Sequence, residues 1–206
     1  MKRSLGWVVG CAAACAAGAC ATAASPGASA AGAASSGAAS PARDSRAASA
    51  VSAASGPAAT ALLAAASGGT AAGNARFVAV GNDKVGLHLE VENATPGRHG
   101  VFVSARSACG DAQVAAHYNP GRGAHHGAPK AAVRHSGDLG NLEVDASGKG
   151  TLDVVVADVS LASVQNGVVD RVLVVSRDAD DLQTDPDGAQ CPPALCGLIL
   201  APPVNR

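Results

Sequence analysis

Short apolar runs, separated by glycine, proline and asparagine, characterise the second half of the chain. Between residues 85 and 91, apolar side chains at every odd position alternate with Gly86, His88 and Glu90. A period of two is typical of a β-strand with one face in a core. Further strands are expected in short runs of apolar or β-branched residues at 77–80, 101–103, 142–144, 151–156 and 168–175. No segment has a convincing helical period, so strands and no helices are predicted here.

Several short strands with turn signals between them predict an all-β domain, an antiparallel sandwich or barrel. A weaker strand signal precedes them at about 58–66. Two long segments, 104–140 and 179–193, lack strand character. Long loops in a compact β domain are usually functional or held by a crosslink, so these two segments are where functional residues are expected.

The N-terminus has the pattern of an export signal. Residues 1–3 are a short cationic start, and residues 5–19 are uncharged and apolar or small. This order is typical of a secretory signal, and the apolar stretch is too short for a comfortable membrane-spanning helix. Residues 1–20 are therefore predicted to be a lipoprotein-like signal peptide. The mature protein is expected in the bacterial periplasm or cell envelope, where disulfides persist.

Two cysteines in this segment end patterns that resemble a bacterial lipobox. Residues 17–20 end at Cys20, whose lipidation would anchor the mature protein, for example to the outer membrane. Residues 8–11 end at Cys11 and fit better by residue type, but they leave an apolar region of only about five residues. Ordinary cleavage near residues 21–23 is the other alternative. An N-terminal lipid anchor is the only membrane attachment that the sequence predicts.

Residues 21–56 are mostly alanine, serine, glycine and proline, with charges only at Arg43, Asp44 and Arg46. Such a composition cannot bury enough surface to offset the entropy lost on ordering the chain. We expect a disordered tether, with transient helical turns because alanine favours helix. The folded domain is then expected to span residues 57–206.

Composition and charge exclude several classes of function. The chain has 206 residues and a net charge of -1, so no overall field draws it to nucleic acid or to anionic membranes. Aromatic residues make up 2% of the chain, too few for the stacking platforms of nucleic-acid modules. No apolar run of about 18 residues follows the N-terminus, which excludes a multi-pass helical membrane protein. The sequence names no protein partner and leaves a homodimer open.

Histidines concentrate in the first long segment. His117, His126 and His135 are nine residues apart, and Asp138 follows three residues later. Three imidazoles and one carboxylate form a closed four-coordinate set suited to zinc. The surrounding loop is rich in glycine and proline and has no core of its own, so a metal would organise it. A solvated, histidine-rich loop without a metal is the alternative that the spacing alone leaves open.

Six segments resemble, in order and spacing, those of copper/zinc superoxide dismutases. They are residues 97–104 (GRHGVFVS), 118–120 (YNP), 126–130 (HGAPK), 135–141 (HSGDLGN), 173–182 (LVVSRDADDL) and 196–199 (CGLI). The first stands where the family has its strand G-x-H-G-F-H-V-H, and the next three are similar to its zinc loop. The last two resemble its late strand, the start of its electrostatic loop and its final strand. The resemblance covers about 75–202 and implies an eight-stranded Greek-key β-barrel.

The resemblance implies a zinc site. His117 matches the ligand that bridges copper and zinc in the family. His126, His135 and Asp138 match the remaining zinc ligands. His125 is a neighbouring rival for His126, but counting back from the Pro-Lys pair that follows favours His126.

The resemblance also assigns residues around the metal. Asp180 matches a carboxylate that steadies a zinc-ligating imidazole, a common arrangement, and His99 matches a structural histidine. Cys109 and Cys196 stand where the family has its intrasubunit disulfide. Cys191 is left over, as a free thiol, a rival partner for Cys109 or an intermolecular link.

The copper half of the family's site is missing. Phe102 and Ser104 replace the two histidines of the H-V-H pair, Ser176 replaces the late-strand histidine, and only His117 remains. Pro193 stands where the family has the arginine that guides superoxide. One imidazole and two hydroxyls do not hold both oxidation states of copper, so zinc is expected and copper is not. The implied protein is an exported zinc-binding domain without dismutase activity. An active superoxide dismutase and a periplasmic metal-handling protein are the alternatives.

Overall fold

The computed structural model describes residues 45–54, 56, 58–81, 84–110, 114–121, 124–162, 165–188 and 192–201. One helix precedes eight strands: α1 (Ser45–Ala53), β1 (Ala58–Ala65), β2 (Ala72–Ala79), β3 (Lys84–Glu92), β4 (Gly97–Val103), β5 (Asp138–Val144), β6 (Gly150–Ala157), β7 (Val172–Ser176) and β8 (Pro193–Leu198). The predicted signal peptide with Cys20, the tether up to residue 44, and Cys191 lie outside the described residues.

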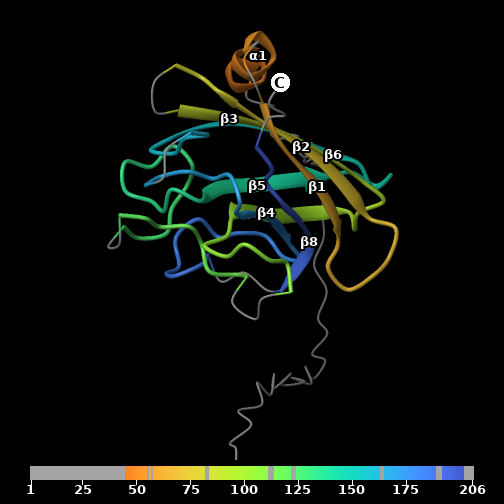
Figure 1. The fold of residues 1–206 in the computed structure, drawn as a ribbon. Helices are drawn as coiled ribbons and strands as arrows, with labels where there is room; N and C mark the ends of the chain where they lie inside the picture. Colours follow the sequence, from red (N-terminus) through yellow and green to blue (C-terminus); the bar gives the residue numbers. More distant parts are fainter. Residues whose placement is uncertain are drawn as a thin grey trace, which may run out of the picture. The chain divides into compact units, whose positions relative to one another are not determined.

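The eight strands close into an antiparallel barrel in the order β1-β2-β3-β6-β5-β4-β7-β8 (Figure 1). β3 pairs with β6, and β4 pairs with β7, although the strands of each pair are not consecutive in the sequence. Such crossed antiparallel pairing is the Greek-key arrangement. The predicted eight-stranded barrel is therefore confirmed.

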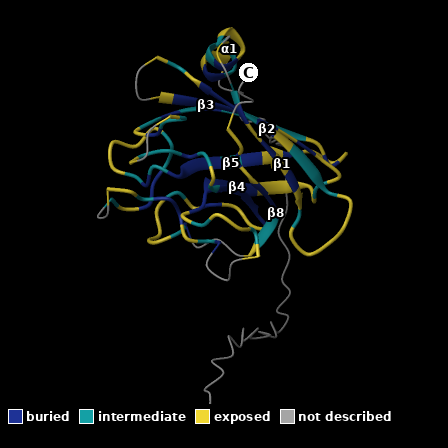
Figure 2. Ribbon diagram, viewed as in Figure 1, coloured by how far each residue is buried: buried dark blue, intermediate teal, exposed yellow. Residues whose placement is uncertain are grey.

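Side chains that point inward from alternating positions form one apolar core. In β3 the side chains of Val85, Leu87 and Leu89 are all buried, as the period of two predicted. Phe77 and Leu142 are buried from other sides of the barrel. Each such burial contributes roughly 1.5–3 kcal/mol, which makes this core the main source of stability. In Figure 2 the barrel strands are largely buried, whereas much of the connecting loops is exposed.

Several strands begin at residues other than those predicted: β4 begins at Gly97 and β5 at Asp138, four residues before the predicted starts in both cases. β2 begins at Ala72 and not at Phe77, because its alanine- and glycine-rich start has weak strand propensity of its own but pairs with both β1 and β3. β7 begins at Val172 and not at residue 168. Asp170 has a φ of 63°, in the left-handed region, which ends any extended strand at that point.

The predicted tether is wrong at its C-terminal end, because Ser45–Ala53 forms α1. Ala47 and Val51 lie on one face of this helix and are buried, and the helix contacts β3 and β6. The barrel covers that face, and such packing is what stabilises a helix this short. Among the described residues, no helix has the length and apolar character that a membrane span needs.

A Gly86→Ala substitution is expected to displace α1, because the added methyl carbon would lie 2.6 Å from Val51 Cγ2. Overpacking of this kind should lower the free energy of unfolding by about 1–2 kcal/mol, measured by urea denaturation. Adding Val51→Ala should recover part of the loss. Gly56→Ala is the control, since its added carbon would meet nothing within 4 Å. Parental stability of Gly86→Ala would contradict this account of how α1 is held.

Candidate metal centre

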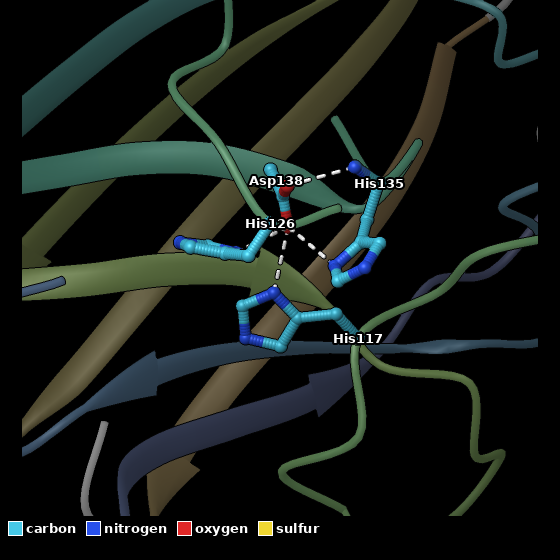
Figure 3. A group of neighbouring side chains, drawn as sticks. All are labelled: His117, His126, His135 and Asp138. Atoms are coloured by element: carbon cyan, nitrogen blue, oxygen red, sulfur yellow. Dashed lines mark hydrogen bonds and ion pairs between the residues drawn. The ribbon is translucent and has the colours of Figure 1, made fainter. Parts of the chain in front are cut away.

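Three histidines and one aspartate form a buried cluster beside the barrel (Figure 3). Asp138 is the first residue of β5, and the histidines lie on the segment between β4 and β5. His117, His126, His135 and Asp138 are 7%, 4%, 6% and 0% exposed. One nitrogen or oxygen from each lies within 4.8 Å of the others. The fold thus brings together the four residues that the spacing singled out.

The Asp138 carboxylate is the centre of the cluster. Its Oδ1 lies 2.7 Å from His117 Nδ1, 3.2 Å from His126 Nδ1 and 3.4 Å from His135 Nδ1. Its Oδ2 accepts hydrogen bonds from the backbone N–H groups of Gly127 (3.0 Å) and His135 (2.9 Å). The backbone therefore holds one carboxylate oxygen and directs the other toward three imidazoles.

Two of the three ligand distances from Asp138 fit a tetrahedral zinc ion, whereas its 2.7 Å separation from His117 is that of a direct hydrogen bond. With zinc–ligand bonds of about 2.0–2.1 Å, the ligand atoms of a tetrahedral site lie about 3.3–3.4 Å apart. The distances of 3.2 and 3.4 Å from Asp138 Oδ1 to His126 and His135 match this spacing. The Nδ1 atoms of these two histidines are buried without a hydrogen-bond partner among the described residues. Buried polar atoms are rarely left unpaired, and one cation would satisfy both.

Asp180 contacts His126 from the side away from the cluster. His126 Nε2 donates to Asp180 Oδ1 at 2.7 Å, which leaves Nδ1 facing the other ligand atoms. Asn141 holds Asp180 in place, because its Oδ1 accepts from the Asp180 N–H and its Nδ2 donates to the Asp180 carbonyl oxygen. A carboxylate in this position fixes the tautomer and the orientation of a metal-binding imidazole.

The imidazoles and carboxylates stabilise each other's charged forms. Burial lowers the pKa of His126, but its close interactions with the carboxylates of Asp138 and Asp180 outweigh it and raise the pKa to about 10. Burial raises the pKa of Asp138, but His117 and His126 outweigh it and hold that pKa well below its ordinary value. A metal needs a neutral imidazole, so metal binding here would release the proton of His126.

His125 lies outside the cluster, so His126 is the histidine that faces the other ligand atoms. The His125 side chain is exposed, and its Nδ1 lies 2.5 Å from Asp185 Oδ2. Asp185 Oδ1 accepts a hydrogen bond of 2.6 Å from the backbone N–H of His126. The hydrogen bond from this N–H and the contact with His125 lower the pKa of Asp185.

Asn141 contacts Asp180, and Asp185 contacts the backbone of His126. The sequence analysis missed both residues. Asn141 belongs to the HSGDLGN segment, and its place three residues after Asp138 was a usable signal. Asp185 lies in the second long segment, far from the histidines in sequence. Only the path of that segment in the folded protein brings it to His126.

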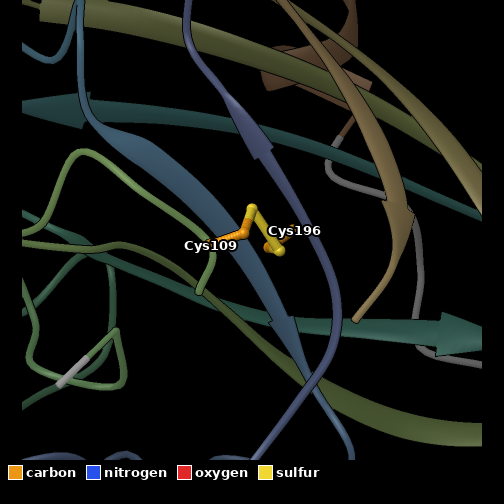
Figure 4. The surroundings of a disulfide bond; sticks show 2 residues. All are labelled: Cys109 and Cys196. Atoms are coloured by element: carbon orange, nitrogen blue, oxygen red, sulfur yellow. A yellow bond between two sulfur atoms is a disulfide. The ribbon is translucent and has the colours of Figure 1, made fainter. Parts of the chain in front are cut away.

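A disulfide joins Cys109 to Cys196 (Figure 4), with the two Cα atoms 5.9 Å apart. It links the segment after β4 to β8 across a sequence separation of 87 residues. This is the pairing that the resemblance implied.

Comparison with known proteins identifies the family. The family profile described as copper/zinc superoxide dismutase (SODC) matches residues 71–199, more than half of the chain. The chain belongs to the copper/zinc superoxide dismutase family. Its sequence segments, its barrel and its disulfide all agree with this membership.

Individual relatives of the dismutase family are also similar to part of this chain. The chain is 34% identical over 121 residues to the copper chaperone for superoxide dismutase of Rattus norvegicus, covering 55% of this chain and 40% of that protein. It is 36% identical over 112 residues to superoxide dismutase (Cu-Zn) 2 of Brassica juncea, covering 53% and 72%. It therefore spans about two fifths of the chaperone's length. The solved structure of the clock protein EA4 matches with 29% identity and a TM-score of 0.61, covering 70% of this chain and 95% of that one.

Phe102, which the resemblance places at a copper-ligand position of the dismutase family, lies in apolar packing. Its side chain is 1% exposed. It lies in a second apolar cluster with Val114, Val172, Val174 and Cys196. Its ring stacks on His117, with centroids 4.0 Å apart and planes 19° apart. The phenyl ring therefore lies against the only imidazole that remains of the copper set.

Ser104 and Ser176, which the resemblance places at two other copper-ligand positions, are also buried, and their hydroxyls form hydrogen bonds with the backbone. Ser104 Oγ accepts a hydrogen bond of 3.0 Å from the Arg106 N–H. Ser176 Oγ donates to the Asp178 carbonyl oxygen at 2.5 Å. Neither hydroxyl is a replacement for the imidazole that holds copper in both oxidation states.

Proposed function

We propose that this chain is an exported, zinc-binding member of the copper/zinc superoxide dismutase family without dismutase activity. The observation that carries the proposal is the stacking of buried Phe102 on His117. An apolar ring occupies the place of a copper ligand, while all four zinc-type ligands remain together. Dismutation needs a redox-active metal, and zinc has no redox chemistry to supply.

The role we assign to zinc is structural. Four protein ligands close the coordination sphere of a tetrahedral ion, whereas catalytic zinc sites keep a position open for water or substrate. The segment between β4 and β5 has no regular secondary structure of its own in its described part. Cross-linking three of its histidines to Asp138 at the start of β5 would hold that segment on the barrel.

Export is part of the same proposal. It is supported by the signal-like pattern of residues 1–20 and by the disulfide, because disulfides persist outside the cytoplasm. We further propose a lipid on Cys20. Mass spectrometry of the mature N-terminus tests both, since a lipoprotein would begin at a modified Cys20.

The purified protein is expected to contain about one zinc ion, negligible copper and no superoxide dismutase activity. Elemental analysis after dialysis and a superoxide assay measure these quantities. The wild-type protein loaded with copper is the control. Dismutation by that sample well above the level of adventitiously bound copper, or stoichiometric copper after dialysis, would contradict the proposal.

Converting Phe102, Ser104 and Ser176 together to histidine is expected to create copper binding. The pairing of β4 with β7 matches Phe102 with Val174, so the three positions lie on neighbouring stretches of one sheet. Turnover should stay slow, because Pro193 supplies no positive charge, and steering of an anion changes rates by roughly 10- to 1000-fold. Ser104→His with Ser176→His alone is the matched control, since Phe102 still covers His117. If the triple variant binds no copper, the substitution of these three residues is not the reason why the parent lacks a copper site.

Metal handling is a second candidate, favoured by the 34% identity to the copper chaperone of Rattus norvegicus. A chaperone must give up its metal to a partner within a useful time, whereas a structural site retains it. Rapid transfer of zinc to an acceptor protein at stoichiometric concentration would support handling. Retention over hours would support the structural role.

A further inference from the structure

Two carboxylates from one stretch of chain contact His126 at two different points. Asp180 accepts from the ring Nε2 at 2.7 Å, and Asp185 accepts from the backbone N–H at 2.6 Å. Both belong to residues 180–188, which lie between β7 and β8. The ring and the main chain of one candidate zinc ligand are thus held by the same segment.

The two contacts that Asp185 makes differ in strength. Its partner His125 has a side chain that is 76% exposed, and the Asp185 side chain itself is 46% exposed. Water and salt screen such a pair, which therefore contributes little. The contact with the His126 N–H is partly buried, and a charged acceptor makes a stronger hydrogen bond than a neutral one. The main-chain contact is therefore the one that matters for the metal centre.

The segment is itself folded into a compact turn over His126. Gly188 N–H donates to the Thr184 carbonyl oxygen at 2.7 Å, and Asp181 N–H donates to the Gly188 carbonyl oxygen at 3.2 Å. Gly188 has a φ of +68°, and a carbon added to it would overlap Asp180 Oδ1 and lie 2.7 Å from His126 Nε2. Gly188 thus packs directly against the hydrogen bond between Asp180 and His126.

We propose that residues 180–188 clamp His126, and that Asp185 is the positioning residue that sets how slowly the cluster releases zinc. The inference rests on the proposed function, because it presumes that zinc is the ion bound. For zinc to leave, its ligands must turn away one after another. Asp180 restrains the imidazole of His126, and Asp185 restrains the backbone on which that imidazole turns. Without Asp185, His126 keeps the contacts of its ring with Asp138 and Asp180 but loses the carboxylate that holds its backbone N–H.

The test is the rate at which zinc passes from the full-length protein to an excess of chelator. Asp185→Ala should release zinc roughly tenfold faster, the lower end of the effect of outer contacts on metal sites. Asp185→Asn should stay much closer to the parental rate than Asp185→Ala, because its amide oxygen still accepts from the His126 N–H, although without the charge. Asp187→Ala is the matched control, since the Asp187 carboxylate has no hydrogen bond or ion pair with the described residues. His125→Ala should also stay near the parental rate, because the exposed pair contributes little.

A second measurement does not depend on metal. Hydrogen exchange of the His126 amide, followed by NMR in protein treated with chelator, should be roughly tenfold faster in Asp185→Ala and much closer to the parental rate in Asp185→Asn. Equal zinc release by Asp185→Ala, Asp187→Ala and the parent would overturn the clamp. A parent that binds no zinc would instead overturn the proposed function. Amide exchange would then still decide whether Asp185 holds residue 126, and an unchanged rate would overturn the clamp as well.

Discussion

Replacing Asp138 with alanine is expected to abolish stoichiometric zinc binding. Three imidazole nitrogens approach Asp138 Oδ1, and Oδ2 accepts from the backbone of Gly127 and His135. The substitution removes a ligand and also the anchor of the loop that carries two other ligands. Changes to outer contacts alone typically cost 10- to 100-fold in metal affinity, so the loss should exceed about 100-fold. Competition with a zinc-binding dye, together with elemental analysis after dialysis, measures it.

Two further variants separate the causes of that loss. Asp138→Asn keeps the shape and an acceptor for the backbone N–H groups but removes the charge, so it should retain more loop order than Asp138→Ala. Asp145→Ala is the control, because Asp145 is exposed and its hydrogen bonds go to Ser147 and Lys149, away from the cluster. Full zinc content in Asp138→Ala would show that Asp138 is not a zinc ligand.

Removing the disulfide is the change expected to cost the barrel most in stability. Cys109→Ala with Cys196→Ala opens a link between residues 87 apart in sequence. The chain-entropy estimate for a loop of that length is about 4–5 kcal/mol, lost from the free energy of unfolding. Urea denaturation of the oxidised parent and of the double variant measures the difference.

Reduction provides the internal comparison for the disulfide. The reduced parent should unfold at nearly the urea concentration that unfolds the double variant, and reductant should not change the variant. A parent whose unfolding midpoint is the same with and without reductant would show that the link contributes no stability.

The strands and the metal cluster could be predicted because single side chains carry the signal. Alternation in residues 85–91 shows which face enters a core, whatever the neighbouring strands are. Three histidines and an aspartate at short spacing indicate ligand chemistry by residue type alone. The loss of copper ligands is equally visible, because Phe102 and Ser104 cannot replace imidazole. The strands and the candidate ligands could be predicted because they depend on the chemical type of each side chain.

Other parts depend on what each segment touches. Alanine-rich residues 45–53 resemble the tether before them, and they form α1 because β3 and β6 cover Ala47 and Val51. The start of β2 is explained in the same way. Its small residues have little strand preference of their own and become extended because they pair with β1 and β3. A weak local preference leaves such segments undetermined until a partner surface is present.

At the site, the sequence by itself predicted which side chains could bind metal, and the resemblance to the dismutase family indicated which copper ligands are absent. The tertiary structure decided how they meet: that Phe102 stacks on His117, and that Asp185 contacts the His126 backbone. The physical reason is distance along the chain. Contacts between residues tens of positions apart follow from barrel closure and loop path, which no local pattern of side chains records.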